Sequence, residues 1–142
     1  SMGHAGAIAL GIALHRPEQR VLVLDGDGAA LMHMGTMATI GAAAPSNLMH
    51  ILLNNEAHES VGGAPTAAAA VLFPAVAVSL GYHIVKAAET EEELARALAE
   101  LQRADALTFL EIRTAVGSRA DLGRPTTTPA ENKEALMRTL CG

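Results

Sequence analysis

The sequence predicts an α/β fold in which a doubly wound parallel sheet carries helices on both faces. The chain has 142 residues and half of them are hydrophobic, which is enough for a single domain with a substantial core. Short runs of Val, Leu and Ile alternate with longer Ala-rich segments of helical composition. That alternation is typical of βαβ units and therefore of a parallel sheet.

The first part of the chain is predicted to contain two helices and two strands. Residues 5–14 are small and apolar, and Pro17 with its polar neighbours ends the helical pattern. Residues 21–25 (VLVLD) have the composition of a parallel strand that is buried on both faces. Residues 29–43 return to helical composition, and residues 48–54 (LMHILLN) resemble a second buried strand.

The middle of the chain begins with a loop. Residues 62–65 (GGAP) carry strong turn signals. We expect a helix over residues 67–80 and a weaker strand over residues 83–87.

A fourth helix is predicted to begin after Thr90, a good N-cap residue. Three glutamates follow it in the first turn, where the helix dipole favours negative charge, and Leu94, Leu98 and Leu101 give an apolar face. Residues 108–114 (TFLEIRT) are expected to close the sheet. A loop over residues 117–129 and a final helix over residues 130–140 complete the pattern.

Charge and composition exclude several classes of protein. The formal net charge is −5 and no basic run is present, which argues against a nucleic-acid partner. Cys141 is the single cysteine, so no internal disulfide can form. No stretch reaches the roughly 20 apolar residues of a membrane-spanning helix, and the first residues lack the positive charge that precedes a signal sequence. We expect a cytoplasmic protein without a membrane partner.

Polar motifs follow the first two predicted strands. Gly26-Asp27-Gly28 comes directly after one strand and Asn54-Asn55 ends the next, with 25 residues between Gly28 and Asn54. That spacing fits one helix plus one strand. Both motifs therefore reach the carboxyl edge of the sheet, where ligands of such folds bind.

The chemistry of these motifs suggests a diphosphate held through a metal ion. The glycines let a ligand approach the main chain, and the amides that open the next helix suit a phosphate. Yet the motif contains no Lys or Arg, and Asp27 adds negative charge. A Mg²⁺ ion bound by carboxylate and amide oxygens would resolve this conflict.

Two simpler interpretations stay open from the residues alone. Gly and Asp are common turn residues, so the first motif could be only a tight turn and the asparagines could cap a strand. A dinucleotide site is less favoured, because GDGAAL lacks the third glycine of the GxGxxG pattern.

GDG followed by NN at this distance resembles the signature of thiamine diphosphate enzymes, in the half called the PP domain. The resemblance implies thiamine diphosphate and Mg²⁺ as cofactors. It implies Asp27, the Asn55 side chain and the main-chain carbonyl of Ala57 as metal ligands. Met2 would wedge the cofactor into a bent shape, and Met32 would lie near its pyrimidine ring. The residues expected at the cofactor are Ser1, Met2, Gly26, Asp27, Gly28, Ala29, Met32 and Asn55.

Further segments narrow the resemblance. SMGHA, GDGAALMHMG, NNEAHES with GG, and DLGRPTTTPAENK are similar to enzymes that decarboxylate phosphonopyruvate to phosphonoacetaldehyde and carbon dioxide, with sulfopyruvate decarboxylases as near relatives. A small-molecule 2-oxo acid is the implied substrate. Ala64 stands where these relatives carry Gln, a departure that bears on substrate specificity more than on cofactor binding.

The same resemblance implies that the active site needs a second part. In the family, a glutamate that activates the cofactor belongs to a separate PYR domain, and no segment here is similar to it. We therefore expect residues 1–142 to be one PP domain, either the C-terminal half of a larger enzyme or one subunit of a split enzyme, within a homo- or hetero-oligomer. A non-catalytic module for cofactor binding or assembly is the alternative.

Two of the six histidines are candidate catalytic residues. His4 lies beside Met2 and His58 beside the expected metal ligands, so either imidazole could act as a general acid or contact the substrate anion. The other histidines are better explained as residues of the core, an interface or the surface without a catalytic role. Arg119 and Arg124 could pair with a phosphonate group, but we favour a structural role in holding the last loop.

Overall fold

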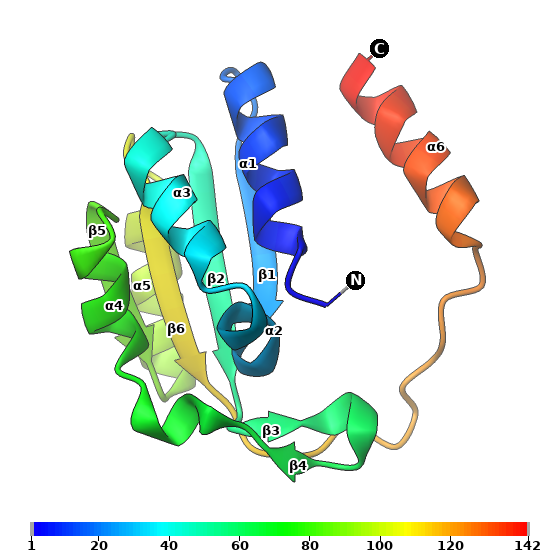
Figure 1. Ribbon diagram of the computed structural model, residues 1–142. Coiled ribbons are helices and arrows are strands. Elements are labelled where there is room, and N and C mark those ends of the chain that lie inside the picture. The colour runs from blue at the N-terminus through cyan, green and yellow to red at the C-terminus, as the bar shows by residue number, and fades with distance from the viewer. Residues whose placement is uncertain (1, 142) are drawn as a thin grey trace.

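Four parallel strands form the central sheet. The computed structural model describes residues 2–141, and the side chains of residues 2–140. The strand order is β1-β2-β6-β5 (Figure 1). The strands are β1 (Val21–Gly26), β2 (Leu48–Asn54), β5 (Ile84–Ala88) and β6 (Thr108–Arg113). The expectation that β6 closes the sheet is wrong, because β6 lies between β2 and β5.

Helices cover both faces of the sheet, which confirms the predicted fold class. The helices α1 (Ala5–His15), α3 (Gly35–Ala43) and α4 (Phe73–Ser79) lie on one face and α5 (Glu91–Leu101) on the other (Figure 1). Successive side chains of β2 point to opposite faces of the sheet, so the core has two parts. Leu48 and Leu52 pack in the cluster of α1, α3 and α4, whereas Met49 and Ile51 pack with α5.

Strand β1 departs from the expectation of burial on both faces. Val23 is buried under α1, but Leu22 and Leu24 on the other face are 54% and 63% exposed. The composition of β1 matches a fully covered strand. Its position at the edge of the sheet, beyond the reach of α5, explains the difference.

Two predicted helices are each divided in two. In place of the helix predicted over residues 29–43 stand α2 (Asp27–Met32), which begins earlier, and α3; they are separated at His33, whose φ of −133° and ψ of 43° are not helical. Residues 67–80 contain the short 3₁₀ segment η2 (Ala67–Ala70) and α4. Pro74 lies in the first turn of α4, where proline is tolerated, and it restricts the residue before it.

The helix α5 begins as predicted. Thr90 accepts a hydrogen bond from the N–H of Glu93, and the Glu93 carboxylate accepts one from the N–H of Thr90. This reciprocal pair is a capping box.

A close backbone contact joins α3 to the turn between α4 and β5. A Cβ built on Gly41 would overlap the carbonyl oxygen of Leu80 and lie 2.7 Å from its carbonyl carbon. Gly41 therefore allows this approach, which a larger residue would block.

The remaining elements lie at the periphery. A two-stranded ribbon of β3 (Ala57–His58) and β4 (Ala64–Pro65), joined by η1 (Glu59–Val61), follows β2 at the carboxyl edge of the sheet, so the loop predicted at residues 62–65 includes a short strand. The helix α6 (Pro129–Cys141) stands apart from the sheet (Figure 1), and Arg16 Nε donates to the Leu140 carbonyl at 2.7 Å. Within residues 2–141, no helix combines the length and apolar character that a membrane span requires.

Candidate functional site

A pocket of about 450 Å³ lies at the carboxyl edge of β1 and β2. The strand ends and α2 form one wall, and the β3–β4 ribbon and the loop after β6 form the other. Most residues predicted for the cofactor or metal meet there. The predicted residues that line it are Met2, Gly26, Asp27, Gly28, Ala29, Asn55, Ala57 and His58.

Asp27 is the first residue of α2 and only 2% exposed. Thr66 Oγ1 donates to its Oδ2 at 2.5 Å. Among residues 2–141, no Lys, Arg or His forms an ion pair with this carboxylate. A buried carboxylate without a counter-charge is costly unless a cation accompanies it.

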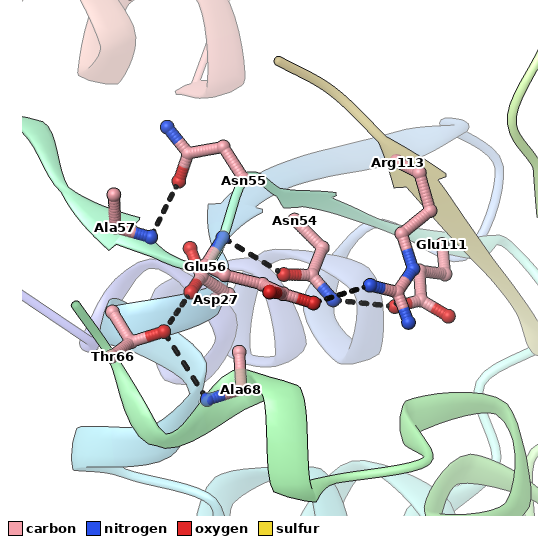
Figure 2. A network of polar contacts seen from close by, with 9 residues as sticks. All are labelled: Asp27, Asn54, Asn55, Glu56, Ala57, Thr66, Ala68, Glu111 and Arg113. Atoms are coloured by element: carbon pink, nitrogen blue, oxygen red, sulfur yellow. Dashed lines mark hydrogen bonds and ion pairs between the residues drawn. The ribbon is translucent and has the colours of Figure 1, made fainter. Parts of the chain in front are cut away.

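Asn55 lies in the loop between β2 and β3, and Ala57 is the first residue of β3. The Asn55 Oδ1 atom accepts the N–H of Ala57 at 3.1 Å (Figure 2), and an amide oxygen has a second lone pair for another partner. Ala57 is paired across the ribbon with Pro65. Because proline has no N–H, Pro65 cannot donate a hydrogen bond to the Ala57 carbonyl.

Asn54, the first asparagine of the pair, has a structural role. Asn54 is 1% exposed, and its Nδ2 donates to Glu111 Oε1 at 2.6 Å (Figure 2). Its Oδ1 accepts the N–H of Glu56 at 3.2 Å. Asn54 therefore joins β6 to the loop that follows β2.

The two glycines of the GDG motif have different surroundings. A Cβ built on Gly26 would meet nothing within 4 Å, so the main chain there is open to a ligand. A Cβ built on Gly28 would overlap the imidazole ring of His58. The absence of a side chain at Gly28 thus allows the close approach of the His58 ring.

These residues fit a diphosphate that carries a divalent cation. Within residues 2–141, no group of three His, Cys, Asp or Glu side chains could hold a metal ion. An ion at Asp27 would depend on amide and main-chain oxygens and on oxygens of the ligand. Mg²⁺ commonly binds in that way, with few carboxylates and with substrate phosphates.

Two predicted residues, Met32 and His4, do not line the pocket. Met32 is 54% exposed and is not part of its lining. The ring of His4 packs against that of His33, with centroids 4.3 Å apart, and does not line the pocket. Ser1 lies outside the described residues. Met32 is the last residue of α2, and its expected place near the cofactor stays a prediction.

Several residues at the site were not among those predicted for the cofactor, the metal or catalysis. Thr66 contacts Asp27, and Glu59 Oε1 accepts both Asn55 Nδ2 at 3.2 Å and the N–H of Gly117 at 2.5 Å. Thr114 and Gly117 also line the pocket. The position of Thr114 directly after a strand end was the available signal.

Another group of buried polar side chains lies on the face of the sheet that α1, α3 and α4 cover. His50 is 1% exposed, its Nδ1 lies 2.9 Å from the Tyr82 hydroxyl, and its Nε2 lies 3.7 Å from Asp25 Oδ2. Burial, and secondarily the Asp25 charge, raise the pKa of Tyr82 well above its ordinary value of 10.0. Tyr82 therefore stays neutral near pH 7.

Comparisons with known proteins bear on the family and the fold of the chain. Residues 1–112 match the family model of the thiamine pyrophosphate enzyme C-terminal TPP binding domain. The chain is 46% identical over 131 residues to phosphonopyruvate decarboxylase of Streptomyces viridochromogenes, covering 92% of this chain and 33% of that protein. It therefore spans about a third of that relative's length.

A shorter match is to a two-subunit enzyme. The chain is 43% identical over 89 residues to sulfopyruvate decarboxylase subunit beta of Methanothermobacter thermautotrophicus, covering 63% of this chain and 48% of the subunit. The fold also matches thiamine diphosphate-dependent 4-hydroxybenzoylformate decarboxylase of Rhodococcus jostii, with a TM-score of 0.69 and 22% identity, covering 83% of this chain and 24% of that one.

Proposed function

We propose that this chain, which belongs to the family of C-terminal TPP-binding domains of thiamine pyrophosphate enzymes, forms the diphosphate-binding half of a 2-oxo acid decarboxylase. The observation that carries the proposal is Asp27, a buried carboxylate without a cationic partner among residues 2–141, at the wall of a pocket formed by the GDG and NN segments.

Mg²⁺ would be held by three protein oxygens. They come from the Asp27 carboxylate, the Asn55 side chain and the Ala57 main chain. Thr66 fixes one Asp27 oxygen and leaves the other for the ion. The open main chain at Gly26, with Gly28 and Ala29 beside it, would receive the diphosphate.

When bound, thiamine diphosphate supplies the electron sink that lets a 2-oxo acid lose carbon dioxide. The chain's own contribution is to orient the cofactor and to provide polar groups beside it. His58 is the candidate for holding or donating a proton, because its ring lines the pocket above Gly28.

Phosphonopyruvate is the proposed substrate, with phosphonoacetaldehyde and carbon dioxide as products. The 46% identity to a phosphonopyruvate decarboxylase extends over 92% of this chain, whereas the match to a sulfopyruvate decarboxylase subunit covers 63%. Sulfopyruvate remains the second candidate.

A complete active site would require a PYR-type domain from another segment or another chain. The subunit organisation in the name of the sulfopyruvate relative supports such a partner. Gentle purification from the native source, followed by mass measurement of every chain in the assembly, tests this. A lone 142-residue chain that still decarboxylates a 2-oxo acid would refute the need for a partner.

The metal site is tested by Asp27→Ala in that assembly. We expect loss of Mg²⁺-dependent binding of thiamine diphosphate, measured by calorimetry, with the fold retained. The matched control is Asp105→Ala, which removes an exposed carboxylate outside the pocket lining. Equal cofactor affinity in the two variants would refute the site.

The substrate is tested by assaying carbon dioxide release from a panel of 2-oxo acids. Phosphonopyruvate should give the highest kcat/KM. Preference for sulfopyruvate would support the second candidate, and release from neither acid would refute both.

A further inference from the structure

We propose that Glu56 and Arg113 form a latch that positions the loop of Asn55 and Ala57, and that the latch sets the affinity of this loop for a divalent cation. The inference rests on the proposed function, because Asn55 and Ala57 are the metal ligands proposed above. It assigns a role to two residues that do not line the pocket.

The loop contains an unusual backbone conformation. Glu56, between the two proposed ligands, has a φ of 59°, in the left-handed region that residues with a side chain rarely adopt. Such a conformation persists only where surrounding contacts impose it, and it is common at ligand-binding sites. The contacts of Glu56 should therefore explain why the loop keeps this shape.

Three contacts hold Glu56. Its N–H donates to Asn54 Oδ1 at 3.2 Å and its carbonyl accepts the N–H of Thr66 at 2.9 Å. Its carboxylate accepts Arg113 Nη1 at 2.6 Å (Figure 2). The contact with Arg113 is the one that depends on the Glu56 side chain.

Arg113 is itself anchored to the core of the sheet. It is the last residue of β6 and pairs with Asn54 in the parallel register. Its Nε lies 3.6 Å from Oε1 of Glu111, which is 4% exposed and also accepts Asn54 Nδ2 (Figure 2). The guanidinium thus links a buried carboxylate to the carboxylate of the loop, so the latch is tied to a rigid element.

An ordinary surface ion pair would not have this effect. The side chains of Arg113 and Glu56 are 37% and 42% exposed, and pairs of that exposure often contribute little to stability. The difference lies in what the pair holds, because Glu56 is flanked on both sides by proposed ligands. Groups that orient metal ligands typically change metal affinity by about 10- to 100-fold when they are removed.

The test compares two substitutions of Glu56 with a matched control. Glu56→Ala removes the carboxylate but keeps a side chain that disfavours positive φ, whereas Glu56→Gly removes the carboxylate and tolerates positive φ. Glu100→Ala is the control, because it breaks the ion pair of Lys86 with Glu100, also partly exposed and 2.8 Å long, on other elements.

The first measurement is the Mg²⁺ concentration that half-saturates thiamine diphosphate binding to the native assembly. We expect it to rise about 10-fold or more in Glu56→Ala, to return most of the way in Glu56→Gly, and to stay unchanged in Glu100→Ala. An unchanged value in Glu56→Ala would overturn the latch while leaving the proposed function intact.

The second measurement needs no cofactor. Hydrogen–deuterium exchange of the amides of residues 55–58 should be faster in Glu56→Ala than in the unmodified protein and in Glu100→Ala. Unchanged exchange would overturn the latch, even if the unmodified protein failed to bind thiamine diphosphate with Mg²⁺. That binding failure would refute the proposed function, so the two results are separable.

Discussion

Two glycines in helix interiors should respond oppositely to the same added methyl group. Gly41 in α3 and Gly11 in α1 both have backbone angles that alanine can adopt. A Cβ at Gly11 would meet nothing within 4 Å, whereas one at Gly41 would overlap the Leu80 carbonyl. Helix propensity alone favours Ala over Gly by about 0.5–1 kcal/mol.

The atoms that block Gly41→Ala belong to the backbone, so they cannot move aside by a change of rotamer. Overpacking of a rigid site costs typically about 1–3 kcal/mol, and this overlap lies at the upper end. We expect Gly41→Ala to lose about 3 kcal/mol of unfolding free energy and about 10 °C in Tm. We expect Gly11→Ala to gain about 0.5 kcal/mol.

Urea unfolding followed by circular dichroism measures both values, and thermal unfolding gives Tm independently. If Gly41→Ala were as stable as Gly11→Ala, the close approach of α3 to the turn after α4 would be refuted. A loss of stability in Gly11→Ala would refute the assumption that helix propensity governs the open site.

Three further predictions concern polar contacts and the pocket. The pKa of Tyr82 is raised above 10.0, so its contribution to stability is fully present below pH 10.0 and is lost as the pH rises further, by at most about 1.4 kcal/mol per pH unit. Urea unfolding at alkaline pH should therefore show that the unfolding free energy falls less steeply with pH in Tyr82→Phe than in the unmodified protein. An identical pH dependence in the two proteins would contradict this. Thr90→Ala removes the hydroxyl that accepts the N–H of Glu93 and should lower the unfolding free energy by about 1 kcal/mol, where a change below about 0.3 kcal/mol would be too small for a cap. Gly26→Ala should change the unfolding free energy by no more than about 0.5 kcal/mol. It should weaken Mg²⁺-dependent binding of thiamine diphosphate about 10-fold or more, because a methyl group in a tight pocket costs roughly 1–3 kcal/mol. Undiminished affinity would show that the diphosphate does not approach Gly26.

The parts of the fold that depend on local pattern could be predicted from the sequence. Strands β1, β2 and β6 begin and end close to their expected limits, and Thr90 caps α5 as expected. The order of the strands was not predictable, because the composition of β6 does not reveal whether it lies inside the sheet or at its edge. The exposure of Leu24 has the same origin, since burial of an edge strand depends on which helix reaches it.

The candidate site could likewise be predicted only in part. Gly26, Asp27 and Asn55 could be placed together because each follows a strand end, and parallel strands bring their ends to one edge. Their roles toward a metal or cofactor remain predictions. Met32 is the last residue of α2 and does not line the pocket, and its expected place near the cofactor came only from the resemblance.

Side-chain contacts across long sequence separations could not be predicted from local sequence patterns. Nothing local to Glu56 indicates that its partner is Arg113, 57 residues away.

That separation also has a consequence for biosynthesis. Asn54 and Glu111, like Glu56 and Arg113, are 57 residues apart in the chain. A ribosome that adds about 5–20 residues per second needs roughly 3–11 s to supply the second member of each pair. Until β6 has emerged and inserted beside β2, Asn54 and Glu56 lack their partners Glu111 and Arg113. The nascent chain therefore acquires this geometry late, after most of its helices have already been made.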